Sequence, residues 1–277
     1  MCIRDSTSGL GYNSTPRIGK FYRDQGVIAG LCSSETTLAE MMSRAGNIPI
    51  QFDPGTQWQY GFSTDVLGRV IEVVSGQSLD EFISEKICDP LGMHDTSFIV
   101  PPAKRSRVVA AYVPSETTIR RLNIGERLVH SGDPISSDYH LESNKCFSGG
   151  GGLCSTPSDY MRFCQMLLNG GELNGVRLLK ESTIKLMTID QTGTLSKNFG
   201  FGFSMFPDAE DVDEQLRGAY AWSGYWGLCF RISPRGDWIL VTMAQLAWDE
   251  GATPKWFAEY ERIAAEAITH QAEDASP

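Results

Sequence analysis

The stretch FDPGTQWQYGFSTDVLGRVIEVVSG, Phe52 to Gly76, decides the fold. Apolar side chains recur in its second half at the spacing of one helix face: Val66, Leu67, Val70, Ile71 and Val74. Ser63 or Thr64 is expected to cap the start of this helix, and Gly76 its end. The sequence therefore predicts a helix over residues 63–75, with Tyr60 just before it.

Tyr60 has two interpretations. A tyrosine at the mouth of a helix is often a core aromatic whose hydroxyl reaches the rim of the protein. A phenol in this place also suits a catalytic role, if other motifs of an active site accompany it. The remaining motifs have to decide between the two.

The rest of the chain predicts further helices and a late hairpin. SLDEFISEKICDP, residues 78–90, begins with a capping box of Ser78 and Glu81 and predicts a helix that halts at Pro90. Residues 101–145 mix charges with turn residues and predict loops and short strands beside a cleft. Thr156 should cap another helix, residues 228–246 should form an antiparallel hairpin, and residues 253–270 a closing helix. This order indicates an α+β fold in which helices flank a mostly antiparallel sheet.

Composition excludes several classes of partner. The 277 residues are 41% hydrophobic, enough for a large core. The 24 Lys and Arg residues against 34 Asp and Glu residues give a net charge of −10, which repels nucleic acid. No apolar run approaches the roughly 18 residues that a membrane helix needs, so no membrane association is predicted.

The cysteines and histidines indicate no metal site. Seven cysteines form an odd set without a Cys-x-x-Cys pair or a paired spacing with the four histidines. We expect reduced, mostly buried thiols, no cofactor and no metal, and the odd set favours a cytoplasmic location. The glycine run at residues 149–152 lacks the Lys of a P-loop and predicts a tight backbone crossing near the cleft.

Several separated motifs together resemble a known family. PGTQWQY, VVSGQSLDEFI, DPLGMHDTSF, SGGGGLCSTPSDYMRF and AWSGYWGLCFRISP follow one another as in the penicillin-recognising serine hydrolases. These include class C β-lactamases, D-alanyl-D-alanine carboxypeptidases and family VIII carboxylesterases. The resemblance runs from Thr7 to about Leu246 and implies a β-lactamase-like fold and catalysis through an acyl-enzyme.

The resemblance assigns roles to residues of three motifs. Tyr60 would be the base, which a nearby lysine keeps ionised, because an isolated phenol has a pKa near 10 and stays protonated. Trp222, Ser223 and Gly224 would form the third motif and contact the substrate together with Phe62. The backbone N–H of Tyr225 would form half of the oxyanion hole.

The first motif, Ser-x-x-Lys, is missing where the family has it. The chain's one match is Ser182-Thr183-Ile184-Lys185, far beyond Tyr60, and is interpreted as a chance match on a surface helix. We therefore expect residues 1–6, MCIRDS, to be a non-native prefix and residues 7–277 to be a partial catalytic domain. That domain would comprise a helical and loop region, 7–195, and the C-terminal strands and closing helix, 196–277. It would lack the family's N-terminal strands and nucleophile helix.

The third motif bears on the substrate. Trp222 offers one neutral donor where lactamases have Lys or His, and Phe62 stands where they have Asn. A carboxylesterase on small acyl esters is therefore the predicted function, this chain alone being inactive. The alternatives are a β-lactamase or D-amino peptidase on lactam or peptide substrates, and a non-catalytic ligand-binding relative. His130-Ser131-Gly132 imitates the third motif without a following hairpin, and His94 and His140 are expected at the surface or at the rim of the cleft.

Overall fold

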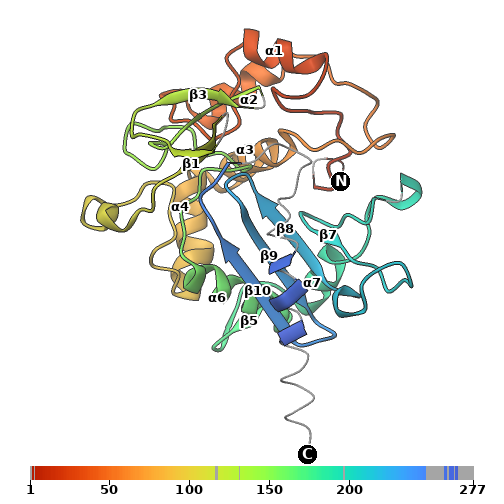
Figure 1. Ribbon diagram of the computed structural model, residues 1–277. Helices are drawn as coiled ribbons and strands as arrows, with labels where there is room; N and C mark the ends of the chain where they lie inside the picture. Colours follow the sequence, from red (N-terminus) through yellow and green to blue (C-terminus); the bar gives the residue numbers. More distant parts are fainter. Residues whose placement is uncertain are drawn as a thin grey trace, which may run out of the picture.

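The computed structural model describes residues 2, 4–115, 118–130, 132–195, 197–247, 259–260, 262–264 and 266–267. A four-stranded antiparallel sheet forms its lower half, with the strand order β10-β9-β8-β7 (Figure 1). The N-terminal helices and the small β3–β4 hairpin gather above it, and α3 crosses near the upper ends of β8 and β9. This arrangement is the predicted α+β fold, in which helices flank an antiparallel sheet.

Helix α3 spans Ser63–Ser75, as the sequence predicts. Gly76 ends it in the left-handed conformation with φ 73°, which glycine adopts without strain. The predicted start cap is wrong, because Phe62 is the N-cap and no side chain caps the helix. The Ser63 hydroxyl hydrogen-bonds the Ser8 hydroxyl instead, at 2.7 Å.

The next helical segment is longer than predicted. Its capping box of Ser78 and Glu81 is present at the start of α4, Leu79–Ile83. A π-helical turn, Ser84–Cys88, and the short helix α5, Asp89–Leu91, continue it to a left-handed Gly92. The prediction that the helix halts at Pro90 is wrong. Pro90 lies in the first turn of α5, where a backbone N–H makes no hydrogen bond within the helix, so proline is tolerated there.

The sheet is built from β7 (Ser204–Met205), β8 (Tyr220–Gly224), β9 (Leu228–Ser233) and β10 (Trp238–Met243). The last two form the predicted hairpin, with Trp238 paired to Ser233 and Met243 to Leu228. Helix α6, Pro157–Leu168, covers one face, and the Thr156 hydroxyl caps it by accepting from Asp159 N–H. Met166 and Leu167 of this helix join Phe230 and Ile232 in the largest core cluster.

The other elements are short. The region predicted as loops and short strands contains the 3₁₀ turn Pro102–Arg107 and two hairpins, β1–β2 and β3–β4. The remaining bounds are: α1 Ile18–Asp24, α2 Leu38–Ala45, β1 Tyr112–Pro114, β2 Ile119–Arg121, β3 Arg127–His130, β4 Asp133–Ser136, β5 Glu172–Leu173, β6 Val176–Arg177, α7 Glu181–Met187, η3 Gly193–Leu195 and η4 Glu214–Leu216.

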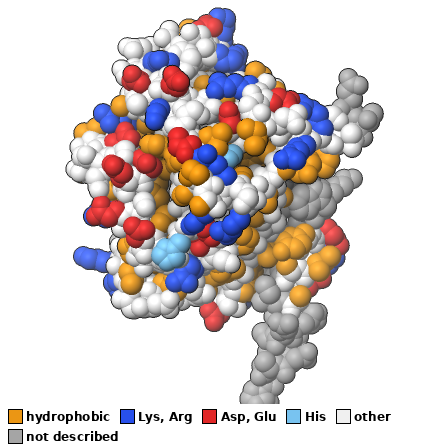
Figure 2. Space-filling view, turned by 90° about the vertical axis from the view of Figure 1, so that its left-hand side faces the viewer, with side chains coloured by type: hydrophobic (Ala, Val, Ile, Leu, Met, Phe, Trp, Pro, Cys, Tyr) orange, Lys and Arg blue, Asp and Glu red, His pale blue; other side chains and the backbone are white. Residues whose placement is uncertain are grey.

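The closing helix predicted over residues 253–270 lies largely outside the described residues. Within it, residues 259–260, 262–264 and 266–267 are helical. Across the described part of the chain, no helix combines the length and apolar character needed to cross a membrane. Acidic and basic side chains are mixed over the face in Figure 2, without one large basic patch.

Candidate active site

Tyr60 lies half-buried in the loop that leads into α3. Backbone hydrogen bonds fix this loop, because Gln59 N–H donates to the Ser6 carbonyl at 2.8 Å and Phe62 N–H to the Gly11 carbonyl at 3.4 Å. A Cβ added to Gly61 would lie 2.5 Å from Gly11 Cα and from Leu10 O. Only glycine allows so close an approach, so the N-terminal segment sets the position of Tyr60.

Strand β8 brings the predicted third motif to the predicted tyrosine motif. The rings of Tyr60 and Trp222 have centroids 5.2 Å apart. Trp222 also meets Phe199 at 5.2 Å, and Phe199 meets Trp58 at 5.4 Å. Tyr60 therefore lies at one end of an aromatic wall that joins the α3 loop to the sheet.

Tyr12 is the second phenol of the site. Its ring is 8% exposed and lies edge-on to Tyr60, with centroids 5.3 Å apart. Burial raises the pKa of Tyr12 well above its usual value, and the neighbouring Tyr60 and Asp65 groups raise it further. A side-chain hydrogen bond joins the two phenols. Tyr12 thus stays protonated at neutral pH and is suited to hold the Tyr60 oxygen in place.

Asp65 is a buried carboxyl behind these tyrosines. It is 2% exposed, and its Oδ1 accepts a short hydrogen bond from the Ser148 hydroxyl. Burial raises the pKa of Asp65 to about 6, although hydrogen bonds from Ser148 and from the backbone of Gly149 and Gly150 act in the opposite direction. The carboxyl consequently holds its proton to a higher pH than an exposed aspartate does.

The glycine run crosses α3 at close range, as predicted. A Cβ on Gly149 would lie 2.1 Å from the carbonyl oxygen of Thr64, in the first turn of α3. No side chain fits there, so Gly149 is needed for the loop to reach Asp65. The run therefore serves the packing behind the site.

The other residues predicted to contact the substrate or the oxyanion differ in their burial and contacts. Ser223 is exposed at the end of β8, and Gly224 pairs with Leu228 across the β8–β9 turn. Tyr225 follows in this turn, and its ring packs edge-on against Trp226 at 5.3 Å. Phe62 is a correction, because its ring is fully buried against Tyr12 and Tyr22 at 4.8 and 4.9 Å. It fills the core and does not face a substrate.

The Ser182 to Lys185 match lies on α7, Glu181–Met187. Ser182 is exposed, and Lys185 forms an ion pair with Glu181 at 2.6 Å on the outer face of the helix. No side chain of a base is paired with Ser182 by a hydrogen bond among the described residues. This geometry is that of an ordinary surface helix.

The histidines give two further corrections. His140 is 6% exposed, not at the surface as expected, and burial lowers its pKa. His130 does lie in a hairpin, because its backbone pairs with Asp133 between β3 and β4. His94 is exposed, as predicted.

The thiols do not form a cluster. The seven cysteines are thiols outside any disulfide, and four of them are buried. Burial raises the pKa of the Cys146 and Cys164 thiols to about 12. No group of three or more His, Cys, Asp and Glu side chains arranged to hold a metal ion occurs within the described ranges.

Sequence reasoning missed Tyr12, Asp65 and Ser148. Asp65 lies in the first turn of α3, on the helix face that also carries Gly68, Arg69 and Glu72, so nothing in the sequence indicated that it is buried. Tyr12 carried no signal either, since only the packing of Gly61 on Gly11 brings it to Tyr60.

Comparison with known proteins identifies the family. The sequence model of the beta-lactamase family matches residues 5–259. The chain belongs to the beta-lactamase family. It is thus a member of the penicillin-recognising serine hydrolases, which have esterase, acyltransferase and carboxypeptidase relatives.

Individual relatives of this beta-lactamase family member are longer than the chain. Protein Rv1367c of Mycobacterium tuberculosis (strain ATCC 25618 / H37Rv) is 27% identical over 221 residues, which are 74% of this chain and 52% of that protein. Esterase EstB of Burkholderia gladioli is 29% identical over 234 residues, 80% of this chain and 58% of EstB. The chain spans about half the length of the curated relatives that it matches.

A solved structure shares the fold. EstCE1, described as a hydrolase with promiscuous acyltransferase activity, superposes with a TM-score of 0.78 at 23% identity. The match covers 96% of this chain and 70% of the EstCE1 chain. The helices and the antiparallel sheet of this beta-lactamase family member are therefore arranged as in EstCE1.

Proposed function

We propose that this chain contributes the base and the substrate wall of a serine carboxylesterase acting on small acyl esters. The observation that carries the proposal is the contact of Tyr60 with Trp222, whose ring centroids are 5.2 Å apart. It supports a site in which a phenol faces a neutral aromatic wall. EstB, a relative that is 29% identical over 234 residues, is named an esterase.

In the proposed reaction Tyr60 acts as general base. Its phenolate removes the proton of a serine hydroxyl while the serine oxygen attacks the ester carbonyl. As the acyl-enzyme forms, the alkoxide leaving group takes this proton from Tyr60 and leaves as an alcohol. Water then attacks the acyl-enzyme with Tyr60 again as the base, which releases the acid and restores the serine hydroxyl. Tyr12, hydrogen-bonded to Tyr60, holds the phenol oxygen in the attacking geometry.

The β8–β9 turn supplies the proposed oxyanion and substrate contacts. The Tyr225 N–H, just after the end of β8, would donate to the developing oxyanion. Trp222 and the exposed Ser223 would line the acyl side. An indole presents no positive charge to a carboxylate, which favours a neutral ester over an anionic lactam.

The nucleophile of the proposed reaction is not carried by the one Ser-x-x-Lys of the chain. Ser182 and Lys185 lie on a surface helix, with Lys185 paired to Glu181. We propose that the serine and lysine come from polypeptide outside residues 1–277, and that residues 1–277 alone do not form the acyl-enzyme. Residues 1–6 remain a proposed non-native prefix, although Asp5 and Ser6 are buried and Ser6 accepts from Gln59.

The test is the coding sequence upstream at the source locus, followed by assays of the extended chain on p-nitrophenyl butyrate and a chromogenic cephalosporin. We expect a Ser-x-x-Lys upstream and ester turnover well above cephalosporin turnover. Tyr60→Phe should lower kcat by about 10²–10⁴-fold with little change in KM, whereas Ser182→Ala should change neither.

Other outcomes would replace the proposal. Dominant cephalosporin turnover would make the protein a β-lactamase. Ester turnover that Ser182→Ala abolishes would place the nucleophile on α7. A native start at Met1 with no turnover would leave the non-catalytic, ligand-binding relative as the function.

A further inference from the structure

The aromatic wall extends beyond Trp222 to two rings that the proposed reaction does not use. Phe199 lies between Trp58 and Trp222, at steep angles to both, with ring centroids 5.4 and 5.2 Å away. Phe199 is 3% exposed, whereas both tryptophans are half-buried. Phe199 is therefore the buried support of the wall, and the two indoles are the parts that a ligand can touch.

The wall offers a ligand apolar ring surface. The Nε1 atom of Trp58 is buried and has no hydrogen-bond partner in the part of the chain that the structure describes. The accessible part of this indole is therefore carbon. Aromatic rings attract one another beyond the area that they bury, because the positive edge of one ring meets the negative face of the next. The wall thus suits a planar aromatic group.

Asp190 fixes Phe199 in this wall. Its Oδ1 accepts hydrogen bonds from the Phe199 N–H at 3.3 Å, the Thr192 N–H at 2.8 Å and the Thr192 hydroxyl at 2.6 Å. Burial acts to raise the pKa of Asp190, but these hydrogen bonds hold it below its ordinary value, so the carboxylate is charged at neutral pH. The Phe199 carbonyl accepts from the Gln191 N–H at 2.9 Å. Asp190 and Gln191 thus hold both backbone polar groups of Phe199.

The wall begins at the residue that protonates the leaving alcohol. In the proposed reaction the alkoxide takes a proton from Tyr60, so the alcohol part of the ester lies beside this residue. Trp222 follows Tyr60 in the wall at 5.2 Å, and Phe199 and Trp58 continue it. A ring on the alcohol part would thus lie within reach of the wall.

We propose that Trp58, Phe199 and Trp222 form a subsite for an aromatic alcohol group, and that Asp190 is the positioning residue that keeps Phe199 in it. The substrates of the proposed esterase are then esters of a small acid with an aromatic alcohol. This inference rests on the proposed function for the place of the alcohol, and on the wall for the preference for a ring.

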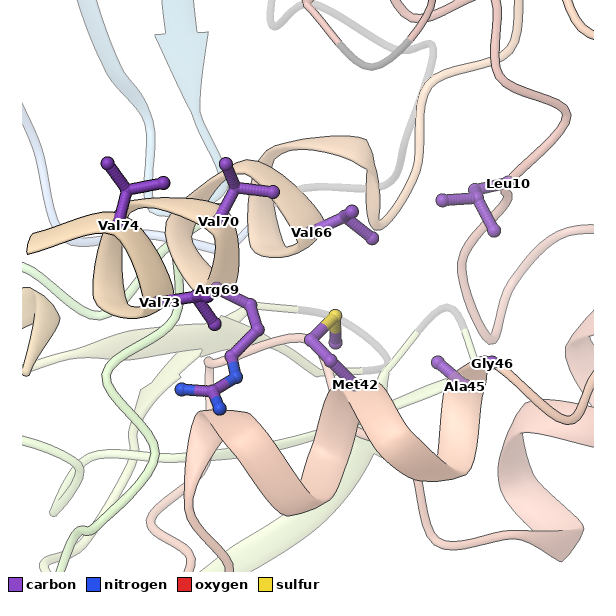
Figure 3. Close-up of a pocket in the computed structure, with 9 residues that line it drawn as sticks. All are labelled: Leu10, Met42, Ala45, Gly46, Val66, Arg69, Val70, Val73 and Val74. Carbon is purple, nitrogen blue, oxygen red and sulfur yellow. The ribbon is translucent and has the colours of Figure 1, made fainter. Parts of the chain in front are cut away.

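A second apolar place on the molecule has to be told apart from the wall. The hollow between α2 and α3 measures about 350 Å³, and the apolar side chains that line it are aliphatic (Figure 3). Met42 and Ala45 lie on its α2 side, and Val66 and Val70 on its α3 side. A ligand held there gains from buried apolar area alone, so no preference for an aromatic ring is expected.

The experiment compares two neutral ketones on the full chain, benzylacetone and its cyclohexyl analogue. Each replaces the ester oxygen of an acetate by a CH₂ group, so neither is hydrolysed and binding needs no nucleophile. The Kd of each is measured by titration with saturation-transfer NMR. We expect benzylacetone to bind about 3–10-fold more tightly, although the cyclohexyl ring is the more apolar of the two.

Variants assign this preference to the wall. Trp58→Leu keeps an apolar side chain and should bring the ratio of the two Kd values to about 1. Asp190→Ala should do the same by releasing Phe199, whereas Asp190→Asn, whose amide oxygen still accepts, should keep most of the preference. Asp190→Ser replaces Asp190→Ala if thermal unfolding shows that the latter is not folded. Phe21→Leu removes a ring that is 52% exposed on α1 and should leave the ratio unchanged.

The remaining outcomes count against one claim at a time. No binding of either ketone, equal Kd values, or tighter binding of the cyclohexyl analogue would overturn the aromatic subsite. Loss of that binding in Val73→Asp would assign it to the hollow between α2 and α3. An unchanged ratio in Asp190→Ala would overturn the role of Asp190.

The subsite and the proposed function fail in different ways. If the chain prefers benzylacetone but the extended chain does not hydrolyse benzyl acetate, the proposed esterase is contradicted and the aromatic subsite stands. If the extended chain hydrolyses esters but shows no preference for a ring, the esterase stands and the subsite is contradicted.

Discussion

Asp65 makes the stability of the protein depend on pH. Its pKa is raised to about 6 by burial, above the ordinary value of 3.8, so the folded state holds this proton more tightly than the unfolded state does. The free energy of unfolding should therefore fall as pH rises from about 4 to 6, by up to about 3 kcal/mol, and level off above 6. Urea unfolding at pH 4, 5, 6 and 7 measures this slope.

The matched variants isolate the carboxyl. Asp65→Asn keeps an oxygen that accepts from Ser148 but cannot ionise, so this variant should lose the downward slope between pH 4 and 6. Asp24→Asn changes an exposed carboxylate, 54% accessible, and should keep the wild-type slope. If the free energy of unfolding has the same slope with pH in the wild type and in Asp65→Asn, the pKa of the Asp65 carboxyl is not raised in the folded protein.

Gly149 is the residue at which backbone packing leaves no room for a side chain. Gly149→Ala would put Cβ 2.1 Å from the Thr64 carbonyl oxygen, and neither backbone segment can yield without moving α3. We expect a loss of at least about 2 kcal/mol in the free energy of unfolding. Gly46→Ala, whose Cβ would have its nearest contact at 3.4 Å, should change stability by less than about 0.5 kcal/mol. Similar losses of stability in both variants would contradict the close packing of Gly149 against Thr64 of α3.

At the scale of the element, the N-cap of α6 should carry measurable stability. Thr156 accepts from Asp159 N–H, so Thr156→Ala leaves a helix donor without this partner. The expected loss is about 1 kcal/mol, measured by urea unfolding at pH 7. Thr194→Ala, which changes an exposed threonine in η3, serves as the control and should lose less than about 0.5 kcal/mol.

Elements with local determinants could be predicted from the sequence. The bounds of α3 follow from its apolar period and from Gly76, and the cap of α6 from Thr156 and Pro157. Pro90 misled the prediction because its effect depends on whether it falls in the interior of a helix or in a first turn, as it does in α5. Hairpin β3–β4 lies in the region predicted as loops and short strands, but its register was not predicted because its apolar residues are few.

The site could be predicted only where a motif marks the residue. The contact of Tyr60 with Trp222 follows from the family motifs, yet the sequence does not show the distance between them. Tyr12 and Ser148 reach the site through the packing of distant loops, which no local pattern encodes. Phe62 was assigned to the substrate by its place in the motif, whereas packing against Tyr22 turns its ring inward.

At the scale of the whole molecule, the aromatic wall joins two core clusters. Tyr60 packs on the cluster of α1, α2 and the N-terminal segment, and Trp222 packs on the cluster between α6 and the sheet. The contact between these two rings therefore links the unfolding of one cluster to that of the other. Aromatic pairs of this kind contribute about 0.5–1.5 kcal/mol beyond the area they bury.

Trp222→Ala should weaken that link. Native-state hydrogen exchange is followed separately in residues 38–45 of α2 and in residues 228–243 of the hairpin. In this variant we expect the free energy of opening of α2 to lie about 1–2 kcal/mol below that of the hairpin, a larger difference than in the wild type. Trp238→Phe, a buried change in β10 away from the wall, should leave the difference unchanged. If Trp222→Ala lowers both free energies equally, the two clusters unfold as one unit through other contacts, and the wall serves the site alone.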